Sequence, residues 1–363
     1  MERIDLIVKE QERTSEIFIG FGLLEFLVED LKERPLGNRL GILTDTRVEE
    51  VLGSRLHQLS TRAGLRTDLI AFSPGEKSKQ WETIQTIFEE LLVRGFDRKS
   101  VLMALGGGVV GDVAGFVASL YMRSIPYVQV PTTLLAQVDS SLGGKNGIDL
   151  PHGKNLLGTF YQPHRVYIDP ATLESLPASE FQNGLAEVVK SAVVRDPELF
   201  DFLDANSSAV LERQLKTLRV IIGRCCRIKT KVVMADEKDK AVRQILNFGH
   251  TVGHALEAHT DYRLPHGTAV SVGMAAETIL AAMTGDLTGQ TVQKILNLLK
   301  RYGLPTRMPK DYDVEKMIGL MHADKKADDG RIAIVSLTGI GKAVVRQDVP
   351  IPLIRDALRE VQA

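Results

Sequence analysis

The sequence has little cysteine and almost no net charge. Only two of its 363 residues are cysteines, and they are adjacent, Cys225 and Cys226. Vicinal cysteines can hardly reach ordinary disulfide geometry, so a disulfide-stabilised fold is excluded and a reducing compartment is expected. The 45 Lys and Arg residues are balanced by 46 Asp and Glu residues, giving a net charge of −1. A broad nucleic-acid or membrane-surface role would need a basic excess, so no nucleic-acid or membrane partner is expected.

Neither a signal peptide nor a membrane span is expected from the sequence. The N-terminus is charged from its second residue and has no apolar stretch of the kind found in signal peptides. The most apolar stretch, 101–122, carries Asp112 and five glycines, so it is predicted to form a strand, a turn and a buried helix instead of a membrane span. These absences predict a cytoplasmic protein.

At 363 residues the chain is longer than one hydrophobic core usually holds, so two domains are expected. Its first half alternates short β-branched runs with stretches of helical apolar spacing. Strands are expected at 40–44, 68–72, 101–105, 127–130 and 166–168, and helices at 47–63, 80–94 and 109–121. Strand–helix alternation is typical of parallel βαβ units, so an α/β domain with a doubly wound, Rossmann-like parallel sheet is predicted for residues 1–175.

The pattern becomes helical after about residue 169. Helices are expected at 184–194, 209–233, 246–259, 268–283, 291–302 and 314–321, and a late pair of extended segments at 332–337 and 343–349. A mainly α-helical C-terminal domain is therefore predicted for residues 176–363.

A glycine-rich turn follows the expected strand 101–105. Gly106, Gly108 and Gly111 match the dinucleotide-binding spacing, which lets backbone N–H groups and a helix N-terminus approach a pyrophosphate. The acidic residue usually found about twenty positions further on is missing, so a ribose would have to be held from elsewhere, for example by the segment 74–79 with its carboxylate and two amines. Close packing of a helix on a strand requires the same glycines, so this segment alone leaves both interpretations open.

Three histidines and two glutamates are candidate metal ligands. On a helix His250, His254 and Glu257 share one face, at i, i+4 and i+7. A further imidazole, His266, follows, and Glu187 on the helix 184–194 could supply a third ligand. Two imidazoles and one carboxylate with an open position are typical of catalytic zinc. A single histidine is more often an ordinary core or surface residue, but His250, His254 and His266 fall within seventeen residues, which favours a metal.

Basic residues lie in a polar, glycine-rich run after the strand 127–130. Gly143 and Gly144 precede Lys145, and Gly153 precedes Lys154, which suits lysines that point into a cleft at an anion. Solvated lysines are the alternative. The glycines favour a small molecule that bears phosphate or carboxylate. This run is expected to be a loop.

The segments 106–112, 131–163, 184–190, 246–257 and 264–267, in this order, closely resemble the 3-dehydroquinate synthase family of sugar phosphate cyclases. The resemblance implies a homodimer with an NAD-binding α/β domain and a helical domain that carries zinc, with cobalt possible. The implied reaction converts a phosphorylated keto acid, 3-deoxy-D-arabino-heptulosonate 7-phosphate, to 3-dehydroquinate and phosphate in the shikimate pathway of aromatic amino acid biosynthesis. It proceeds by transient NAD oxidation, β-elimination of phosphate, reduction and intramolecular aldol cyclisation.

The resemblance also implies roles for individual residues. Zinc would be held by Glu187, His250 and His266. NAD would be held by Glu76, Lys79, Gly107, Gly108, Gly111, Asp112, Thr132, Thr133, Asp139, Lys145, Lys154 and Thr172. The substrate would meet Arg123, Lys145, Asn155, Lys190, Lys229, Arg243, Asn247 and His254. Arg123 would reach the phosphate of the neighbouring subunit's substrate, and one lysine of the motif 324–326 would serve the phosphate as well. Ser124 departs from the family, which usually has glycine there.

Three other functions compete with this interpretation. A metal-dependent polyol dehydrogenase shares the glycine turn and the metal but needs no phosphate-binding residues and would show net NAD reduction. A sister sugar-phosphate cyclase would act on a substrate without a carboxylate, against which Arg243 and Asn247 argue. A nucleotide-sensing module would have no use for an open metal site. The synthase interpretation expects one cleft between the two halves to gather the metal, the nicotinamide and the cationic side chains.

Overall fold

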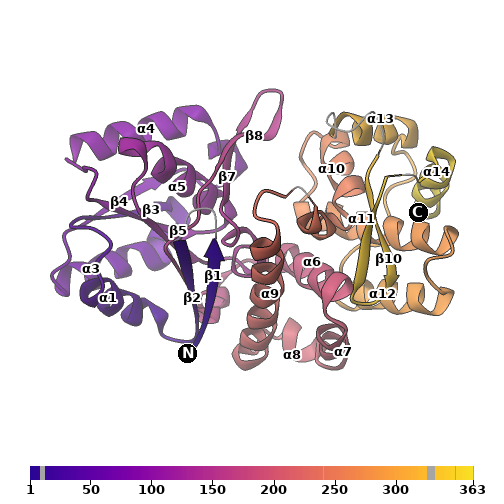
Figure 1. Cartoon of the computed structure of the whole chain (residues 1–363), viewed down its shortest axis with the longest axis horizontal. Coiled ribbons are helices and arrows are strands. Elements are labelled where there is room, and N and C mark those ends of the chain that lie inside the picture. Colours follow the sequence, from indigo (N-terminus) through magenta and orange to yellow (C-terminus); the bar gives the residue numbers. More distant parts are fainter. Residues whose placement is uncertain (9–12, 240, 325–331, 348, 363) are drawn as a thin grey trace. The chain divides into compact units, whose positions relative to one another are not determined.

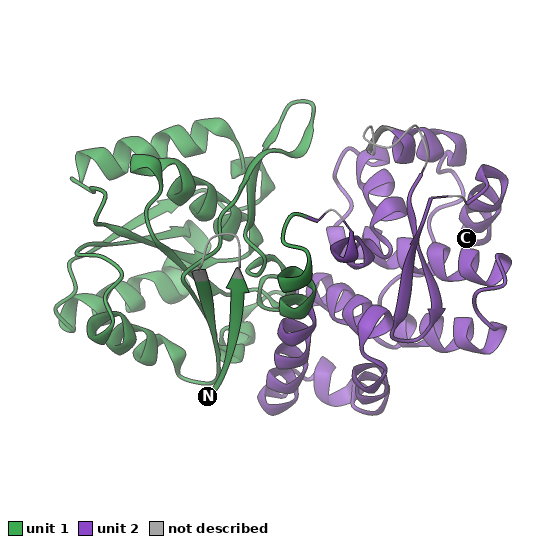
Figure 2. Cartoon of the chain, in the orientation of Figure 1, with its two compact units in different colours: residues 1–177, 229–238 green, residues 178–228, 239–363 purple. Residues whose placement is uncertain are grey.

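The structure, a computed structural model, describes residues 1–8, 13–239, 241–324, 332–347 and 349–362. The chain divides into two compact units (Figure 2). Unit 1 consists of Met1–Pro177 and Lys229–Lys238, and unit 2 of Ala178–Ile228 and Asp239–Ala363. Among the described residues, no helix is both long enough and apolar enough to cross a bilayer.

Unit 1 is built on a seven-stranded sheet in the order β1-β2-β9-β6-β5-β3-β4. Figure 1 labels its strands β1, β2, β3, β4 and β5. Its strands are β1 Glu2–Val8, β2 Arg13–Ile19, β3 Leu40–Asp45, β4 Thr67–Phe72, β5 Val101–Gly106, β6 Tyr127–Pro131 and β9 Arg165–Ile168. All neighbours are parallel except β1 and β2, which form an antiparallel pair at one edge. The five predicted strands are confirmed. The β1–β2 pair was not predicted.

Helices cover both faces of this sheet, which confirms the predicted doubly wound α/β fold. The helices of unit 1 are α1 Leu23–Glu33, α2 Thr46–Val48, α3 Ser54–Arg62, α4 Trp81–Val93 and α5 Gly108–Leu120, with a wider turn Glu49–Gly53 between α2 and α3. One apolar core joins α1 and α3 to the sheet, and a second joins α4 and α5 to the other side. The strands β5 and β6 are buried throughout, as expected for parallel strands covered on both faces.

The polar run that includes Lys145 and Lys154 was predicted to be rich in loops, and this is wrong for both lysines. Most of this run belongs to an antiparallel hairpin, β7 Lys145–Leu150 and β8 Gly153–Phe160, in which Lys145 is paired with Phe160. The glycines that precede the two lysines were interpreted as opening space beside them. Within the hairpin, glycine also permits close strand pairing. A Cβ at Gly158 would lie 2.5 Å from the carbonyl oxygen of Asn146. Lys145 and Lys154 are therefore held on strands.

Unit 2 is mainly helical, as predicted. Its helices are α6 Ala178–Arg195, α7 Pro197–Ala205, α8 Ser207–Leu211, α9 Leu215–Ala235, α10 His250–His259, α11 His266–Met283, α12 Gly289–Arg301, α13 Val314–Asp324 and α14 Ile351–Glu360. The residues of α9 from Lys229 onward group with unit 1. The predicted late extended pair is confirmed as an antiparallel hairpin, β10 Ile334–Gly339 and β11 Lys342–Arg346.

Two predicted helices are broken where the backbone leaves the helical region. The helix expected at 209–233 is divided between α8 and α9, with Arg213 at φ 56° between them. The helix expected at 246–259 starts only at His250, because Gly249 caps it with φ 78° and a 3₁₀ segment, Val242–Asn247, precedes it. His250 is consequently the first residue of α10.

Candidate functional site

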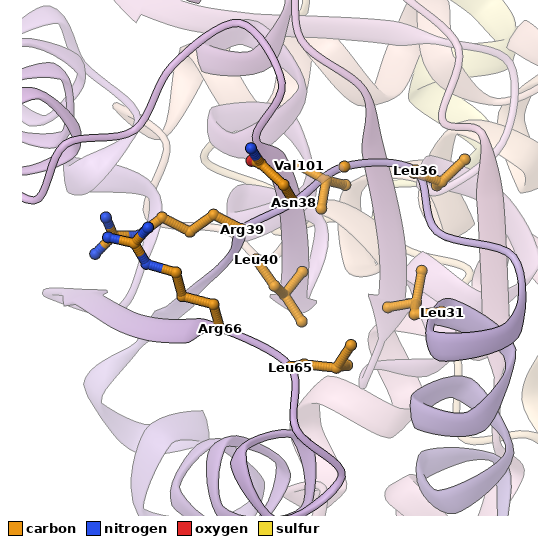
Figure 3. Close-up of a pocket in the computed structure, with 9 residues that line it drawn as sticks. Leu31, Leu36, Asn38, Arg39, Leu40, Leu65, Arg66 and Val101 are labelled. Atoms are coloured by element: carbon orange, nitrogen blue, oxygen red, sulfur yellow. The ribbon is translucent and has the colours of Figure 1, made fainter.

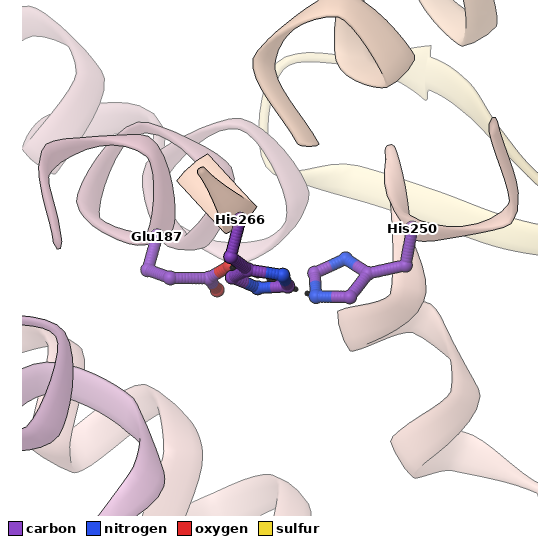
Figure 4. A group of neighbouring side chains, drawn as sticks. All are labelled: Glu187, His250 and His266. Atoms are coloured by element: carbon purple, nitrogen blue, oxygen red, sulfur yellow. Dashed lines mark ion pairs between the residues drawn. The ribbon is translucent and has the colours of Figure 1, made fainter. Parts of the chain in front are cut away.

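Glu187, His250 and His266 converge in unit 2 (Figure 4). One ligand atom from each residue lies within 4.8 Å of the other two. The Nε2 atoms of His250 and His266 lie 3.6 Å and 3.4 Å from the same oxygen, Glu187 Oε1. Two imidazoles and a buried carboxylate that share one point are a suitable donor set for a divalent metal with an open position. Within the described residues, these three are the group of acidic and imidazole side chains with metal-ligand geometry.

The remaining polar atoms of this site have partners of their own. His250 Nδ1 lies 3.2 Å from the carbonyl oxygen of Phe248, and His266 Nδ1 lies 3.5 Å from Glu257 Oε2. Lys190, one turn along α6, forms an ion pair with Glu187 Oε2. Nδ1 of each histidine thus has an oxygen partner, so both Nε2 atoms face Glu187.

Spacing along the sequence did not separate ligands from neighbours. His254 lies on the same helix face as His250, with ring centroids 5.4 Å apart, but it is exposed and is not one of the three convergent residues. Glu257, also on that face, meets His266 through Nδ1 instead.

Burial and neighbouring charges shift the pKa values of all three residues. Burial opposes ionisation of Glu187, but Lys190 and the two histidines outweigh it and hold the pKa of this carboxyl well below its usual range. Burial and the charge of Lys190 lower the pKa of His250 to about 3, so its imidazole is neutral and able to coordinate. Burial also opposes the charged form of His266, but hydrogen bonds to Glu187 and Glu257 raise its pKa to about 10. A metal must therefore displace a proton from His266.

Glycines bring the three helices of this site into contact. A Cβ at Gly273 of α11 would lie 2.0 Å from the carbonyl oxygen of Gly249, and one at Gly253 would lie 3.2 Å from Val270 Cα. Next to His266, the N–H of Gly267 donates to Asn183 Oδ1 of α6, where a side chain would also clash. These contacts place the starts of α10 and α11 beside α6, which carries Glu187.

The glycine turn lies at the carboxyl end of β5 in unit 1. The strand order changes direction at β3: β4 is its neighbour on one side, whereas β5 and then β6 follow on the other side. The turn after β5 therefore lies at the topological switch point, where α/β sheets bind ligands. The glycines also have a packing role, because a Cβ at Gly107 would meet Thr133 at 2.9 Å and one at Gly111 would meet Gln129 at 2.9 Å. Both interpretations left open by the sequence remain compatible with the structure.

Five predicted site residues gather beside this turn. Lys79 is 4% exposed, and its Nζ lies 2.5 Å from Asp112 Oδ2 and donates to Asn155 Oδ1. Lys154 Nζ lies 3.9 Å from Glu76 Oε1. Burial disfavours the charged form of Lys79, but the carboxylates of Asp112 and Glu76 outweigh it and raise the pKa of the amine. A fixed ammonium with carboxylate and amide neighbours can bind the hydroxyls of a ribose.

Other predicted residues of unit 1 have defined partners. Lys229 Nζ donates to the carbonyl oxygen of Asp139 at 2.6 Å and to Asp139 Oδ1 at 2.5 Å. The N–H of Thr132 donates to the carbonyl oxygen of Gly106, and Thr133 Oγ1 accepts from the N–H of Ala136. Thr172 is buried, and its Oγ1 accepts from Gln137 Nε2 at 2.9 Å.

The remaining predicted residues lie outside these clusters. Arg123 and Lys145 are exposed, at the end of α5 and at the start of β7. Arg243 is 4% exposed and shares the 3₁₀ segment Val242–Asn247 with Asn247. Lys325 and Lys326 of the motif 324–326 lie outside the described residues.

Asp45 was not among the predicted site residues. This carboxylate ends β3, which pairs directly with β5, and its Oδ1 accepts from the N–H groups of Arg47 and Val48. Carboxyl ends of neighbouring parallel strands share one edge, so the predicted strand 40–44 could have indicated it.

Ser124 occupies a backbone conformation that suits glycine. Met122, Arg123 and Ser124 have φ values of 49°, 68° and 91°. A side chain at such a φ is strained, which gives a physical reason for the family's glycine. We expect Ser124→Gly to raise stability by about 1 kcal/mol, the relieved strain exceeding the added entropy of the unfolded chain.

Thermal unfolding checks this expectation, and Ser54→Gly is the matched control. Ser54 is exposed at φ −61°, an ordinary helical value, so glycine there should lower the Tm. If Ser124→Gly lowers the Tm as much as Ser54→Gly does, the backbone of residue 124 is not strained.

A cavity of about 40 Å³ lies at the amino ends of the strands, whereas the glycine turn lies at their carboxyl ends (Figure 3). Its lining includes Leu40 and Val101, the first residues of β3 and β5, so it is at the amino ends of the strands. It is too small for a dinucleotide. A hollow of about 630 Å³ runs between β4 and α4 and includes Lys77 and Ser78 of the segment 74–79.

Comparisons with known proteins agree with this arrangement. The family models of the 3-dehydroquinate synthase N-terminal and C-terminal regions match residues 69–183 and 184–327. The chain is 44% identical to a 3-dehydroquinate synthase from Thermodesulfovibrio yellowstonii, over 95% of this chain and 96% of that one. It is similar to 2-epi-5-epi-valiolone synthase from Streptomyces hygroscopicus with NAD⁺ and Zn²⁺ bound, at 28% identity and a TM-score of 0.87, with 95% and 96% of the two chains covered. It is also similar to 2-deoxy-scyllo-inosose synthase complexed with carbaglucose-6-phosphate, NAD⁺ and Co²⁺, at 26% identity and a TM-score of 0.87, with 99% and 100% covered.

Proposed function

The chain belongs to the 3-dehydroquinate synthase family, and from this premise we propose how its residues divide the work of converting 3-deoxy-D-arabino-heptulosonate 7-phosphate to 3-dehydroquinate and phosphate. The reaction is a step of the shikimate pathway. The enzyme is proposed to be a phosphate-eliminating lyase that uses NAD and zinc, with cobalt as the alternative metal. Relatives with NAD⁺ and Zn²⁺ or Co²⁺ bound support this cofactor set.

The convergence of Glu187, His250 and His266 is the observation that carries the proposal. Glu187 is 1% exposed, and its Oε1 faces Nε2 of both imidazoles, so a divalent cation held by all three residues would balance the carboxylate charge on that side. A metal bound there would act as a Lewis acid on substrate hydroxyls and favour their deprotonation. Lys190 supplies the second positive neighbour of Glu187 and orients its carboxylate.

The glycine turn and the cluster of Glu76, Lys79, Asp112, Asn155 and Lys154 are proposed to hold NAD. The cofactor would accept a hydride and return it, so that no net oxidation occurs. The ion pair between Lys79 and Asp112 fixes both side chains at 2.5 Å before any ligand binds. His254, exposed beside His250, is proposed to exchange a proton with the substrate.

One assay separates the proposed reaction from its competitors. The full chain is incubated with NAD⁺, Zn²⁺ and the heptulosonate phosphate, and phosphate release is followed together with NADH absorbance. Phosphate release without accumulation of NADH supports the synthase. Accumulating NADH without phosphate release indicates a polyol dehydrogenase. Faster turnover of a heptulose phosphate without a carboxylate than of the heptulosonate phosphate indicates a sister cyclase. NAD binding without either reaction indicates a sensing module.

Arg243 is proposed to hold the substrate carboxylate through a bidentate contact. It is 4% exposed, so its loss removes a largely desolvated charge. We expect Arg243→Ala to weaken transition-state binding by about 2–3 kcal/mol, seen as a roughly 30- to 200-fold lower kcat/KM. Arg263→Ala is the control, since that side chain is 81% exposed. An unchanged kcat/KM in Arg243→Ala would remove this residue from the site.

The homodimer, the cytoplasmic location and the role of Arg123 toward a neighbouring subunit remain predictions of the family resemblance. Sedimentation of the purified chain tests the first.

A further inference from the structure

We propose that two buried carboxylates, Glu257 and Glu277, position the two histidine ligands of the metal centre, each acting from the helix that carries the other histidine. Glu257 belongs to α10 and faces His266 of α11, whereas Glu277 belongs to α11 and holds the start of α10, where His250 lies. The inference rests on the proposed metal function of Glu187, His250 and His266.

Glu257 fixes the ring of His266. Its Oε2 lies 3.5 Å from Nδ1, while Glu187 Oε1 lies 3.4 Å from Nε2 of the same ring. The imidazole is therefore held between two carboxylates, one at each nitrogen. With Nδ1 keeping its proton for Glu257, Nε2 is the atom that faces the metal position, so Glu257 selects the tautomer as well as the ring orientation. Glu257 is 4% exposed, so its carboxylate is shielded from water, while the His266 side chain is 30% exposed.

Glu277 fixes the backbone from which His250 projects. Its Oε2 accepts a 2.8 Å hydrogen bond from the N–H of Gly249, the residue that caps α10. Glu277 is 1% exposed, and its carboxyl group lies at the helix N-terminus, where the peptide dipoles favour an anion. Gly249 has φ 78°, and a Cβ there would lie 2.6 Å from Met274 Cγ. Position 249 therefore requires glycine. His250 follows immediately, with Nδ1 turned to the carbonyl oxygen of Phe248.

The two contacts run in opposite directions across one helix pair. A shift of α10 along α11 would disturb both contacts, so the relative position of the two Nε2 atoms depends on carboxylates that are not among the three convergent ligands. Glu257 and Glu277 are positioning residues, and their loss should loosen metal binding before it affects the fold.

Metal affinity of the full chain tests this inference. Metal-free wild type, Glu257→Ala and Glu277→Ala are titrated with Zn²⁺ against a chromophoric chelator, and the visible spectrum of each Co²⁺ form is recorded. We expect the Zn²⁺ Kd to rise by about 10- to 100-fold in each alanine variant, with altered Co²⁺ bands. Glu277→Gln keeps an oxygen acceptor for the N–H of Gly249 and should stay close to wild type.

Asp286→Ala is the control for a general loss of stability. Asp286 pairs with Arg346 at 2.7 Å and follows the carboxyl end of α11, whereas His266 begins that helix. The control should melt earlier and keep the wild-type Kd. If it weakens metal binding as much as Glu257→Ala does, the positioning role is overturned.

The remaining outcomes separate this inference from the metal function itself. A wild type that binds no Zn²⁺ overturns the proposed metal centre. A wild type that binds, with folded alanine variants of equal Kd and spectrum, overturns the positioning role alone. Should an alanine variant fail to fold by circular dichroism, Glu257→Asp carries the test, since a carboxylate withdrawn by one methylene must also raise the Kd, and an unchanged Kd counts against the inference.

Discussion

His250→Ala is expected to lose its bound metal and to lower kcat/KM by about 10³-fold or more, or roughly 4 kcal/mol of transition-state stabilisation. The substitution removes one of two imidazoles that lie 3.6 Å and 3.4 Å from a single carboxylate oxygen. The two remaining donors, Glu187 and His266, make a poor site for a divalent metal. Metal content of the purified variant and steady-state turnover with added Zn²⁺ are the measurements.

Two further histidine variants sharpen this result. His322→Ala removes an exposed imidazole from α13 and should keep both metal and turnover. His254→Ala should keep the metal and lose only the proton transfer, about 10²- to 10⁴-fold in kcat. A His250→Ala protein that retained stoichiometric zinc and full turnover would contradict the assignment, and loss of the metal in His254→Ala would mean that the wrong imidazole had been chosen.

Asp30→Ala is expected to lower the free energy of unfolding by about 3 kcal/mol. Asp30 of α1 is 7% exposed, and its Oδ2 accepts from Arg165 Nη1 at 3.0 Å and from the Tyr167 hydroxyl at 2.5 Å. Its Oδ1 accepts from Arg34 Nε at 2.8 Å. Alanine would leave the buried guanidinium of Arg165 with its ion pair to Glu16 of β2, at 3.2 Å, but without the Asp30 carboxylate, and it would remove the acceptor of the Tyr167 hydroxyl.

Urea unfolding measures this loss, and Asp5→Ala provides the comparison. Asp5 pairs with Arg3 at 2.9 Å, but both side chains are about half exposed. Such a pair contributes about 0.5 kcal/mol or less. Equal losses in the two variants would show that burial of the Asp30 network adds nothing to stability.

The sheet of unit 1 was predictable where its strands are apolar and buried on both faces. β5 and β6 are continuous buried runs, and such runs between glycine or polar turns identify parallel strands. β1 was not predicted, because its charged residues Arg3 and Asp5, which alternate with apolar ones, were considered only as evidence against a signal peptide. At a sheet edge, that alternation is the normal pattern of a half-exposed strand.

The metal site was predictable in composition but not in detail. Spacing put His250, His254 and Glu257 on one helix face, and only the packing of α6 against α10 and α11 determines which of them meets Glu187. That packing depends on contacts between residues far apart in sequence, such as Asn183 with Gly267. Local spacing carries no information on such contacts, so the choice of ligands came from the family resemblance and not from the residues themselves.

The glycine contact between α10 and α11 has a consequence for engineering a more heat-resistant enzyme. Replacing helical glycine by alanine is a common stabilising change, worth up to about 1 kcal/mol at each exposed position. At Gly319 of α13, an added Cβ would meet no atom of the described residues within 4 Å outside its own helix backbone and chain neighbours. Gly273 is not open in this way, since a methyl group there would overlap the carbonyl oxygen of Gly249. Alanine at every helical glycine would therefore raise the melting temperature at Gly319, whereas at Gly273 it would separate α10 from α11 and displace the candidate metal ligands on them.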